Sequence, residues 1–180
     1  MTPKPPPPHP LGFSVLELLV VLGLMATVFG LMIPSLAQPL DRQHQRAAIH
    51  RLYGHLNQAR FMAIQQGTWV SACPSVSGRH CDDSTHWHTG WIVFVDGHKT
   101  GQPASEGAIV IRGEGRSTAL ITSGARRRIR FGPGGHAYGS NGTIRQCARS
   151  IRGPSHRIVI SNAGRVRFVK PDQMTVCDGL

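Results

Sequence analysis

An apolar segment near the N-terminus constrains the fold of this chain more than any other feature. Residues 13–36 are almost wholly apolar, and their one ionisable side chain is that of Glu17. As an α-helix, about 24 residues extend roughly 36 Å, which is enough to cross a hydrocarbon core roughly 30 Å thick. A carboxylate in hydrocarbon costs about 3 kcal/mol unless it is paired. We therefore expect a membrane-spanning helix in which Glu17 has a specific partner.

The residues ahead of this segment, 1–12, read MTPKPPPPHPLG. The proline run excludes a helix, and Lys4 is the one lysine or arginine before the apolar run. A positive charge ahead of an apolar run is typical of an export signal. No small-residue cleavage site follows the apolar run, however, so an ordinary cleaved signal peptide does not fit.

The stretch GFSVLELLVV at residues 12–21 resembles the class III signal of type IV pilins and type II secretion pseudopilins. The resemblance implies that a prepilin peptidase removes a leader of residues 1–12 by cleaving between Gly12 and Phe13, and then methylates the new Phe13 amine. It also implies that Glu17 pairs with the Phe13 amine of a neighbouring subunit during filament assembly. The chain would then sit in the bacterial inner membrane through a single helix, with a periplasmic globular domain, and would reach the pilus or cell exterior after assembly.

Residues 37–66 predict a continuation of the helix with an amphipathic pattern. Apolar side chains recur at steps of three and four residues, at Ala47, Ala48, Leu52, Leu56, Ala59, Met62 and Ala63. Gly67 is a typical helix stop. The simplest interpretation of this stripe is a core face that lies on a sheet.

Beyond Gly67 the pattern changes to that of β-strands. Strands are expected at 68–73, 90–96, 108–111, 118–121, 128–131, 143–148, 157–160 and 165–169. Asn141-Gly142 predicts a tight turn, and residues 161–164 predict the turn of a hairpin. We expect an α+β fold in which the long N-terminal helix packs on an antiparallel β domain at residues 67–180.

Four cysteines behind an export-like segment predict two disulfides, for which three connectivities exist. We prefer Cys73 with Cys81, which closes a short loop, and Cys147 with Cys177, which ties the C-terminal tail to a strand. The alternative is a metal site, because His86 and His88 lie near Cys81. No CxxC pair is present, and we expect neither a metal nor another cofactor.

The formal net charge of +11 attracts polyanions or anionic lipid headgroups. Thirteen of the twenty lysines and arginines lie between Arg112 and Lys170, where Glu114 is the one acid. Most of them are arginines, which suit bidentate phosphate contacts better than lysines do. A solvated basic face is the alternative interpretation.

Four stretches of the globular half are similar to the GspH/FimT family of minor pilins and pseudopilins. They are CPS at 73–75, GWIVFVD at 90–96, the FxPxG turn at 131–135 and the hairpin at 157–167. The segment Gly164-Arg165-Val166-Arg167 is similar to the GRxR motif of the FimT branch, whose members bind DNA during natural transformation. The resemblance, which is strongest to that branch, implies that Gly164, Arg165 and Arg167 contact DNA.

The residues support this interpretation independently. Arg165 and Arg167 are two apart on a predicted strand, so their side chains leave the same face. Arg157 is expected to lie near them across the hairpin. Other candidate DNA-contacting cations are Arg145, Arg149, Arg152 and Lys170. No exposed aromatic stripe is evident beside these arginines, so we predict salt-dependent binding of double-stranded DNA without sequence preference.

No Walker A, HExxH or nucleophile-elbow motif is present, so we do not expect an enzyme. Two functions remain. The first is a minor pilin that binds DNA during uptake. The second is a structural minor pilin or type II secretion pseudopilin, of the FimU or GspH type, that primes filament assembly. Both imply other pilins, the prepilin peptidase and the inner membrane as partners, and the first adds DNA.

Overall fold

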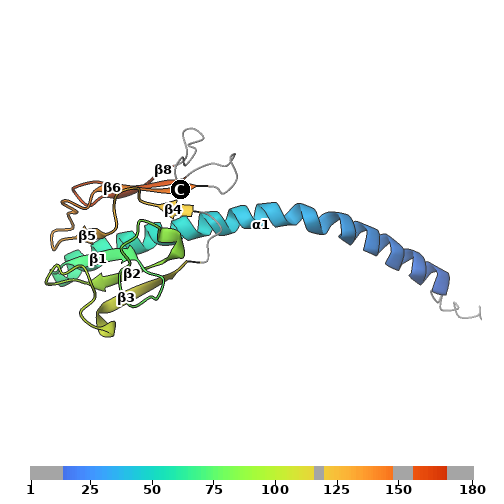
Figure 1. Cartoon of the computed structure of the whole chain (residues 1–180). Helices are drawn as coiled ribbons and strands as arrows, with labels where there is room; N and C mark the ends of the chain where they lie inside the picture. The colour runs from blue at the N-terminus through green and yellow to red at the C-terminus, as the bar shows by residue number, and fades with distance from the viewer. Residues whose placement is uncertain (1–13, 116–119, 148–155, 170–180) are drawn as a thin grey trace, which may run out of the picture. The chain divides into compact units, whose positions relative to one another are not determined.

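The computed structural model describes residues 14–115, 120–147 and 156–169, although not the side chains of 30–42, 45, 120 and 147. The chain divides into two compact units, Met1–Leu40 and Asp41–Leu180. One long helix, α1 (Val15–Gln66), contributes to both units, and eight strands follow it (Figure 1). Two short 3-10 helices, Trp87–Thr89 and Glu106–Ala108, lie between the strands.

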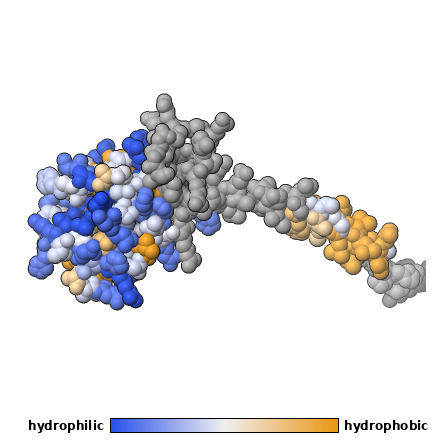
Figure 2. Space-filling model, in the orientation of Figure 1, coloured by the Kyte–Doolittle hydropathy of each residue, from blue (hydrophilic) through white to orange (hydrophobic). Residues whose placement is uncertain are grey.

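In the first unit, Ser14 caps the start of α1. Its hydroxyl accepts the N–H of Leu16 at 3.3 Å, and its carbonyl accepts the N–H of Leu18 at 3.1 Å. The apolar side chains from Val15 to Phe29 are exposed and form a hydrophobic surface (Figure 2). Among the side chains that the structure describes, no helix has an apolar stretch of the length needed to cross a membrane.

In the second unit, α1 ends as its sequence predicts. Gly67 has a φ of 60°, and its N–H donates to the carbonyl of Ile64 at 3.3 Å. The N–H of Thr68 donates to the carbonyl of Ala63 at 3.2 Å. This left-handed glycine satisfies helix carbonyls that would otherwise lack donors, so the chain can leave the helix and enter the first strand.

The first sheet has the strand order β3-β2-β1-β5, and all its pairs are antiparallel. Its strands are β1 (Val70–Pro74), β2 (Gly90–Val95), β3 (Ile109–Glu114) and β5 (Ile129–Phe131). Val70 and Ala72 of β1 point to the same face as Val93 of β2, because Ala72 pairs with Val93. These side chains are fully buried and face the main core.

The second sheet has the strand order β4-β6-β7-β8 and is also antiparallel. Its strands are β4 (Leu120–Thr122), β6 (Gly142–Cys147), β7 (Arg157–Ile160) and β8 (Val166–Val169). Ile144, Ile158, Ile160 and Val166 form its buried face. Alternate residues on the same strands therefore face away from the core.

One core joins the two sheets to the C-terminal half of α1. The helix contributes Ala48, Ile49, Leu52, Leu56, Ala59 and Ala63, all buried. Figure 1 shows strands of the two sheets on opposite sides of this part of α1. The α+β fold expected from the sequence, a long N-terminal helix packed on antiparallel β-structure, is confirmed, and each expected strand is present with ends shifted by a few residues.

A smaller apolar cluster lies on the other face of the first sheet. It contains Ile92, Phe94 and Ile109 together with the disulfide between Cys73 and Cys81. The Cα atoms of the two cysteines are 5.6 Å apart, so the bond closes the short loop that the sequence predicts. The second expected pair, Cys147 with Cys177, lies partly outside the described residues.

Candidate nucleic-acid interface

The outer face of the second sheet carries arginines. On β7, Ile158 is buried toward α1, whereas Arg157 before it is only half-buried. On β8, Val166 is buried and Arg167 is exposed. Arg145 of β6 is exposed in the same alternation. The strand period therefore places three guanidinium groups, from three adjacent strands, on one side of the sheet.

The register brings these arginines close together. Arg145 pairs directly with Arg157 across β6 and β7. Arg167 pairs with Val159, and Arg157 with Val169, so Arg157 and Arg167 are diagonal neighbours across β7 and β8. Directly opposite residues in antiparallel strands have Cβ atoms about 5 Å apart, and like charges there repel. This face therefore concentrates positive charge at a cost to the isolated protein.

A tight turn adds a fourth arginine to this face. The N–H of Ser161 donates to the carbonyl of Arg165 at 3.1 Å, and the Ser161 hydroxyl accepts the N–H of Arg165 at 3.2 Å. The turn also has a hydrogen bond of 2.8 Å from the N–H of Gly164 to the Ser161 carbonyl. Arg165 is exposed and lies two residues before Arg167. The hairpin thus directs both arginines to the solvent side.

Gly164 holds this turn in place and does not itself reach solvent. It is buried, has a φ of 74°, and any Cβ there would overlap the carbonyl oxygen of Gly135. The same carbonyl accepts a 2.9 Å hydrogen bond from Nε of Arg60 on α1. The N–H of Ala137 donates to the carbonyl of Asn162 at 2.8 Å. The hairpin turn is therefore fixed against the 132–137 loop and the helix.

The four arginines of this face, Arg145, Arg157, Arg165 and Arg167, define what we name the arginine face. Within the described residues, none of their guanidinium groups has an ion pair or hydrogen bond. The sequence has no acid between Glu114 and Asp172, so the second sheet itself offers no carboxylate. The arginine face is therefore available to an external anion.

Two arginines of the basic run at 126–130, Arg127 and Arg130, pair with carboxylates of the same unit. Arg127 donates to both carboxylate oxygens of Asp83 at 2.8 Å. Arg130 is paired with Asp96 at 3.1 Å and also donates to the carbonyl of Lys99 at 3.0 Å. The basic run at 126–130 therefore contributes mainly to loop structure, which its sequence alone does not indicate.

The other residues predicted as functional fall into two groups. Glu17 is in the first turn of α1 and is exposed, with no ion pair to another described side chain. The remaining predicted positions lie outside the described residues; they are Gly12, Phe13, Arg149, Arg152, Lys170 and Cys177. No group of three or more metal-binding side chains occurs in the described ranges.

One exposed aromatic residue beside the arginine face is not apparent from the sequence. Tyr138 is 70% exposed and follows Ala137, whose N–H bonds the hairpin turn. Its ring lies against that of His136 in a tilted contact, with centroids 4.7 Å apart. The two-residue spacing of His136 and Tyr138 in a glycine-rich loop is the signal that could have found them. Phe168 of β8 is half-buried and stacks on His50 with ring centroids 4.3 Å apart.

A half-buried histidine, His156, directly precedes β7. Burial is the main cause that lowers the pKa of His156, and the nearby Arg46 and His50 lower it further. Its ring lies 5.3 Å from that of Phe168, between centroids. The neutral form of His156 is therefore favoured in the folded chain, so this residue adds little charge to the neighbouring arginine face at neutral pH.

Comparison with known proteins identifies the family to which this fold belongs. The chain matches the family model of the type II transport protein GspH over residues 48–164. A search of curated proteins found no significant match. Two crystal structures of the type IV minor pilin FimU from Pseudomonas aeruginosa are similar in fold. One has a TM-score of 0.59 and 20% identity over 74% of this chain and 97% of FimU. The other has a TM-score of 0.57 and 20% identity over 72% and 99%.

The matched region contains most of the core and the hairpin turn up to Gly164. The likeness to FimU covers 74% of this chain and 97% of that chain, and it identifies the pilin fold. Both the family and the fold are those of structural pilins. The chain thus belongs to the GspH family and is a pilin-like protein of the minor pilin and pseudopilin type.

Proposed function

We propose that this protein is a minor pilin that binds double-stranded DNA through its arginine face, without sequence preference, during DNA uptake. One observation supports the proposal above others. Arg145, Arg157, Arg165 and Arg167 gather on one side of a sheet and have no partner among the described residues. A phosphate between them would convert a repulsive arrangement into charge-assisted hydrogen bonds.

The geometry suits a phosphate backbone and not a particular base sequence. Arg145, Arg157 and Arg167 lie on regular strands of a sheet, and the residues that the structure describes place no helix on this face to enter a major groove. Contacts to phosphates supply affinity but carry no sequence information. Each neutralised phosphate also releases counterions, which makes the affinity fall steeply as salt concentration rises.

The test measures binding of labelled duplexes of unrelated sequence to the full-length chain, purified in mild detergent, over a range of salt concentrations. The wild type should bind all duplexes alike. The double variant Arg165→Gln/Arg167→Gln should weaken binding by about tenfold or more for every sequence. It should also reduce the slope of log K against log salt by about 2.

The chain offers a matched control for the loss of charge. Arg112→Gln/Arg127→Gln removes the same two charges, but from arginines that pair with Glu106 and Asp83. This control should bind duplexes almost as the wild type does. Equal losses in both double variants would mean that only net charge matters and that the arginine face is not the site. If the wild type bound no labelled duplex even at low salt, DNA binding would be refuted altogether.

The second candidate function is a structural minor pilin or pseudopilin that primes filament assembly. The observation that favours it is the fold likeness to FimU over almost all of that chain. The exposed Glu17, which has no partner among the described residues, suits an intersubunit contact with a processed Phe13 amine. Under this proposal, the prepilin peptidase cleaves between Gly12 and Phe13, and the helix anchors the chain in the inner membrane before assembly.

Glu17→Ala separates the two functions. Incorporation into filaments, measured by immunoblot of sheared fibres, should fall strongly because the carboxylate can no longer pair. Duplex binding by the purified chain should stay unchanged, because Glu17 belongs to a different unit from the arginine face. Glu17→Gln should lower incorporation similarly. Normal incorporation of both variants would exclude the proposed assembly contact.

A further inference from the structure

A row of aromatic rings begins beside the arginine face and ends at a lysine. The rings of Tyr138 and His136 are in tilted contact, with centroids 4.7 Å apart and 34° between the ring planes. His136 meets Trp69 edge-on at 5.4 Å. Nζ of Lys99 lies 4.2 Å from the centroid of the Trp69 ring. Three aromatic rings are thus continuous from an exposed tyrosine to a cation. We name them, with Lys99, the aromatic row.

The backbone fixes the exposed end of this row. Ala137 is fully buried, and its N–H donates to Asn162. His136 is held by its carbonyl, which accepts the N–H of Gly132 at 2.9 Å. The two rings on either side of Ala137 are therefore placed by a rigid loop. Tyr138 is 70% exposed, so its ring contributes little to the stability of the core.

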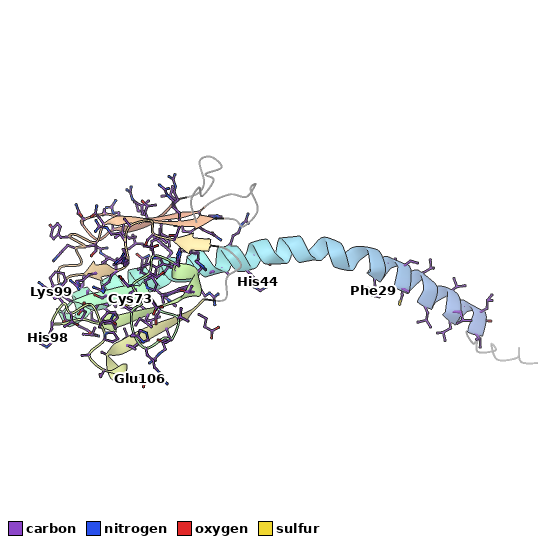
Figure 3. The ribbon with its side chains drawn as sticks, in the orientation of Figure 1. Phe29, His44, Cys73, His98, Lys99 and Glu106 are labelled. Carbon is purple, nitrogen blue, oxygen red and sulfur yellow. A yellow bond between two sulfur atoms is a disulfide. The ribbon has the colours of Figure 1, made fainter. Side chains whose placement is uncertain are left out.

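The row and the arginine face share the hairpin turn. Asn162 accepts the hydrogen bond from the 132–137 loop, and Gly164 packs on the carbonyl of Gly135. Arg165 follows Gly164 directly and is exposed. The row is thus bordered by Arg165 through this turn and by Lys99 at its other end. Figure 3 labels Lys99 near the end of the globular unit where α1 stops.

We propose that Tyr138, supported by His136, stacks on an unpaired nucleobase, so that the protein also binds single-stranded DNA. An exposed aromatic ring between cations matches the chemistry of a single strand, whose bases stack while its phosphates meet the cations. Stacking is tolerant of sequence because every base has a π face. This inference rests on the proposed DNA-binding function and extends it to strand ends and opened duplexes.

Charge argues for a nucleic acid over an apolar protein segment as the occupant. The loop and hairpin that form this surface contain no carboxylate, since the sequence has none between Glu114 and Asp172. Lys99 and Arg165 at its two borders favour a polyanion. The exposed phenol of Tyr138 also retains a polar group that a purely apolar contact would not need.

The test compares three fluorescent probes on the full-length chain in mild detergent. They are a mixed-sequence single strand of about 12 nucleotides, the same sugar-phosphate strand with an abasic site at every position, and a blunt duplex. The wild type should bind the intact single strand roughly 5- to 100-fold more tightly than the abasic strand, as expected for one or two stacked bases. Tyr138→Ala should remove that advantage and leave duplex binding within about twofold. Tyr138→Phe should keep it.

Phe61→Ala is the matched control, because Phe61 is 63% exposed on α1 and does not belong to the aromatic row. It should leave all three affinities unchanged. Tyr138→Trp supplies an independent signal, since a stacked base should quench the new exposed indole. Trp87 and Trp91 are buried and should respond little. The half-buried Trp69 is present in both proteins, so the wild type measures its contribution.

Equal affinity of the wild type for intact and abasic strands would overturn the inference, even if duplex binding persists. An equal loss of all three affinities in Tyr138→Ala would do the same. A fall in filament incorporation without any change in strand binding would assign the row to another pilin subunit. The proposed DNA-binding function fails separately, when neither the duplex nor any single strand binds.

Discussion

Gly164 packs directly on the carbonyl oxygen of Gly135, so closely that a side chain of any size at position 164 would overlap it. The glycine of the Gly-Arg-x-Arg segment therefore acts through packing. Its backbone takes a φ of 74°, which L-residues rarely adopt. The contact with Gly135 joins the hairpin turn to the 132–137 loop. Because Arg60 donates to the same carbonyl, the turn is also connected to α1.

Gly164→Ala should reduce the free energy of unfolding by roughly 2–4 kcal/mol, the sum of left-handed strain and overpacking. Urea unfolding followed by circular dichroism checks this. The control is Gly124→Ala, because Gly124 has a φ of 65° but no atom within 4 Å of the added Cβ. The control should lose only about 1–2 kcal/mol. Equal losses would show that the contact with Gly135 is unimportant.

Asp96→Ala should destabilise the second unit strongly. Asp96 is 3% exposed, and its carboxylate accepts hydrogen bonds from Ser71, Gly101 and Arg130. Removing one partner of a buried ion pair costs about 3–5 kcal/mol, because the other charge is left uncompensated.

Asp83→Ala is the exposed counterpart, since Asp83 pairs with Arg127 at the surface, where the Asp83 side chain is 81% exposed. It should cost no more than about 1 kcal/mol. Chemical unfolding of both variants gives the comparison. A loss in Asp96→Ala as small as that in Asp83→Ala would mean that the 96–101 loop does not depend on this network.

Stability should fall as pH drops below about 6.5, the usual pKa of histidine. Burial, with a further contribution from Arg51, lowers the pKa of His55 in the folded chain. Nδ1 of His55 accepts a 3.0 Å hydrogen bond from the indole N–H of Trp91, which requires that nitrogen to be unprotonated. Between the two pKa values the unfolded chain binds a proton that the folded chain does not, so acid favours unfolding.

Urea unfolding at pH 7.5 and pH 5.5 measures this difference. His55→Gln should reduce it, because glutamine keeps a hydrogen-bond acceptor but does not titrate. His156→Gln should reduce it by a separate amount, since the pKa of His156 is also lowered by burial, Arg46 and His50. If the double variant His55→Gln/His156→Gln lost as much stability between pH 7.5 and pH 5.5 as the wild type, other groups would cause the pH dependence.

Cys73→Ala/Cys81→Ala should lower the free energy of unfolding by about 2–3 kcal/mol. The disulfide closes a loop with a sequence separation of 8, and the loss of its constraint gives the unfolded chain more conformational freedom. The duplex affinity of the variant should not change, because the disulfide belongs to the small cluster with Ile92 and Phe94. Thermal unfolding and duplex binding of the same preparation provide both measurements.

The sequence predicts the elements of the fold well, because local patterns determine them. The alternation in β7 and β8 and most of the three- and four-residue apolar steps of α1 survive in the structure. Ala47, predicted for the core face, is exposed, and Ile49 is buried instead. The solvent-facing positions of Arg165 and Arg167 follow from the same alternation. Gly67 ends the helix because a left-handed residue is needed there.

The remaining features depend on contacts between distant segments. Arg127 is paired because Asp83 happens to face it from 44 residues away, and Arg130 because Asp96 is 34 residues away. The place of Tyr138 beside the hairpin depends on a hydrogen bond between Ala137 and Asn162. Such pairings follow from the strand order, which no local pattern in this sequence reveals.

Under the proposed function, the opposition of Arg145 and Arg157 across β6 and β7 would couple DNA binding to mechanical strength. Their repulsion weakens the empty sheet, and an anion bound only by the folded chain adds about 2.7 kcal/mol when present at 100 times its dissociation constant. The second sheet shares its core with α1. Under the proposed function, a subunit that carries DNA would therefore resist tension on its helix better than an unloaded one.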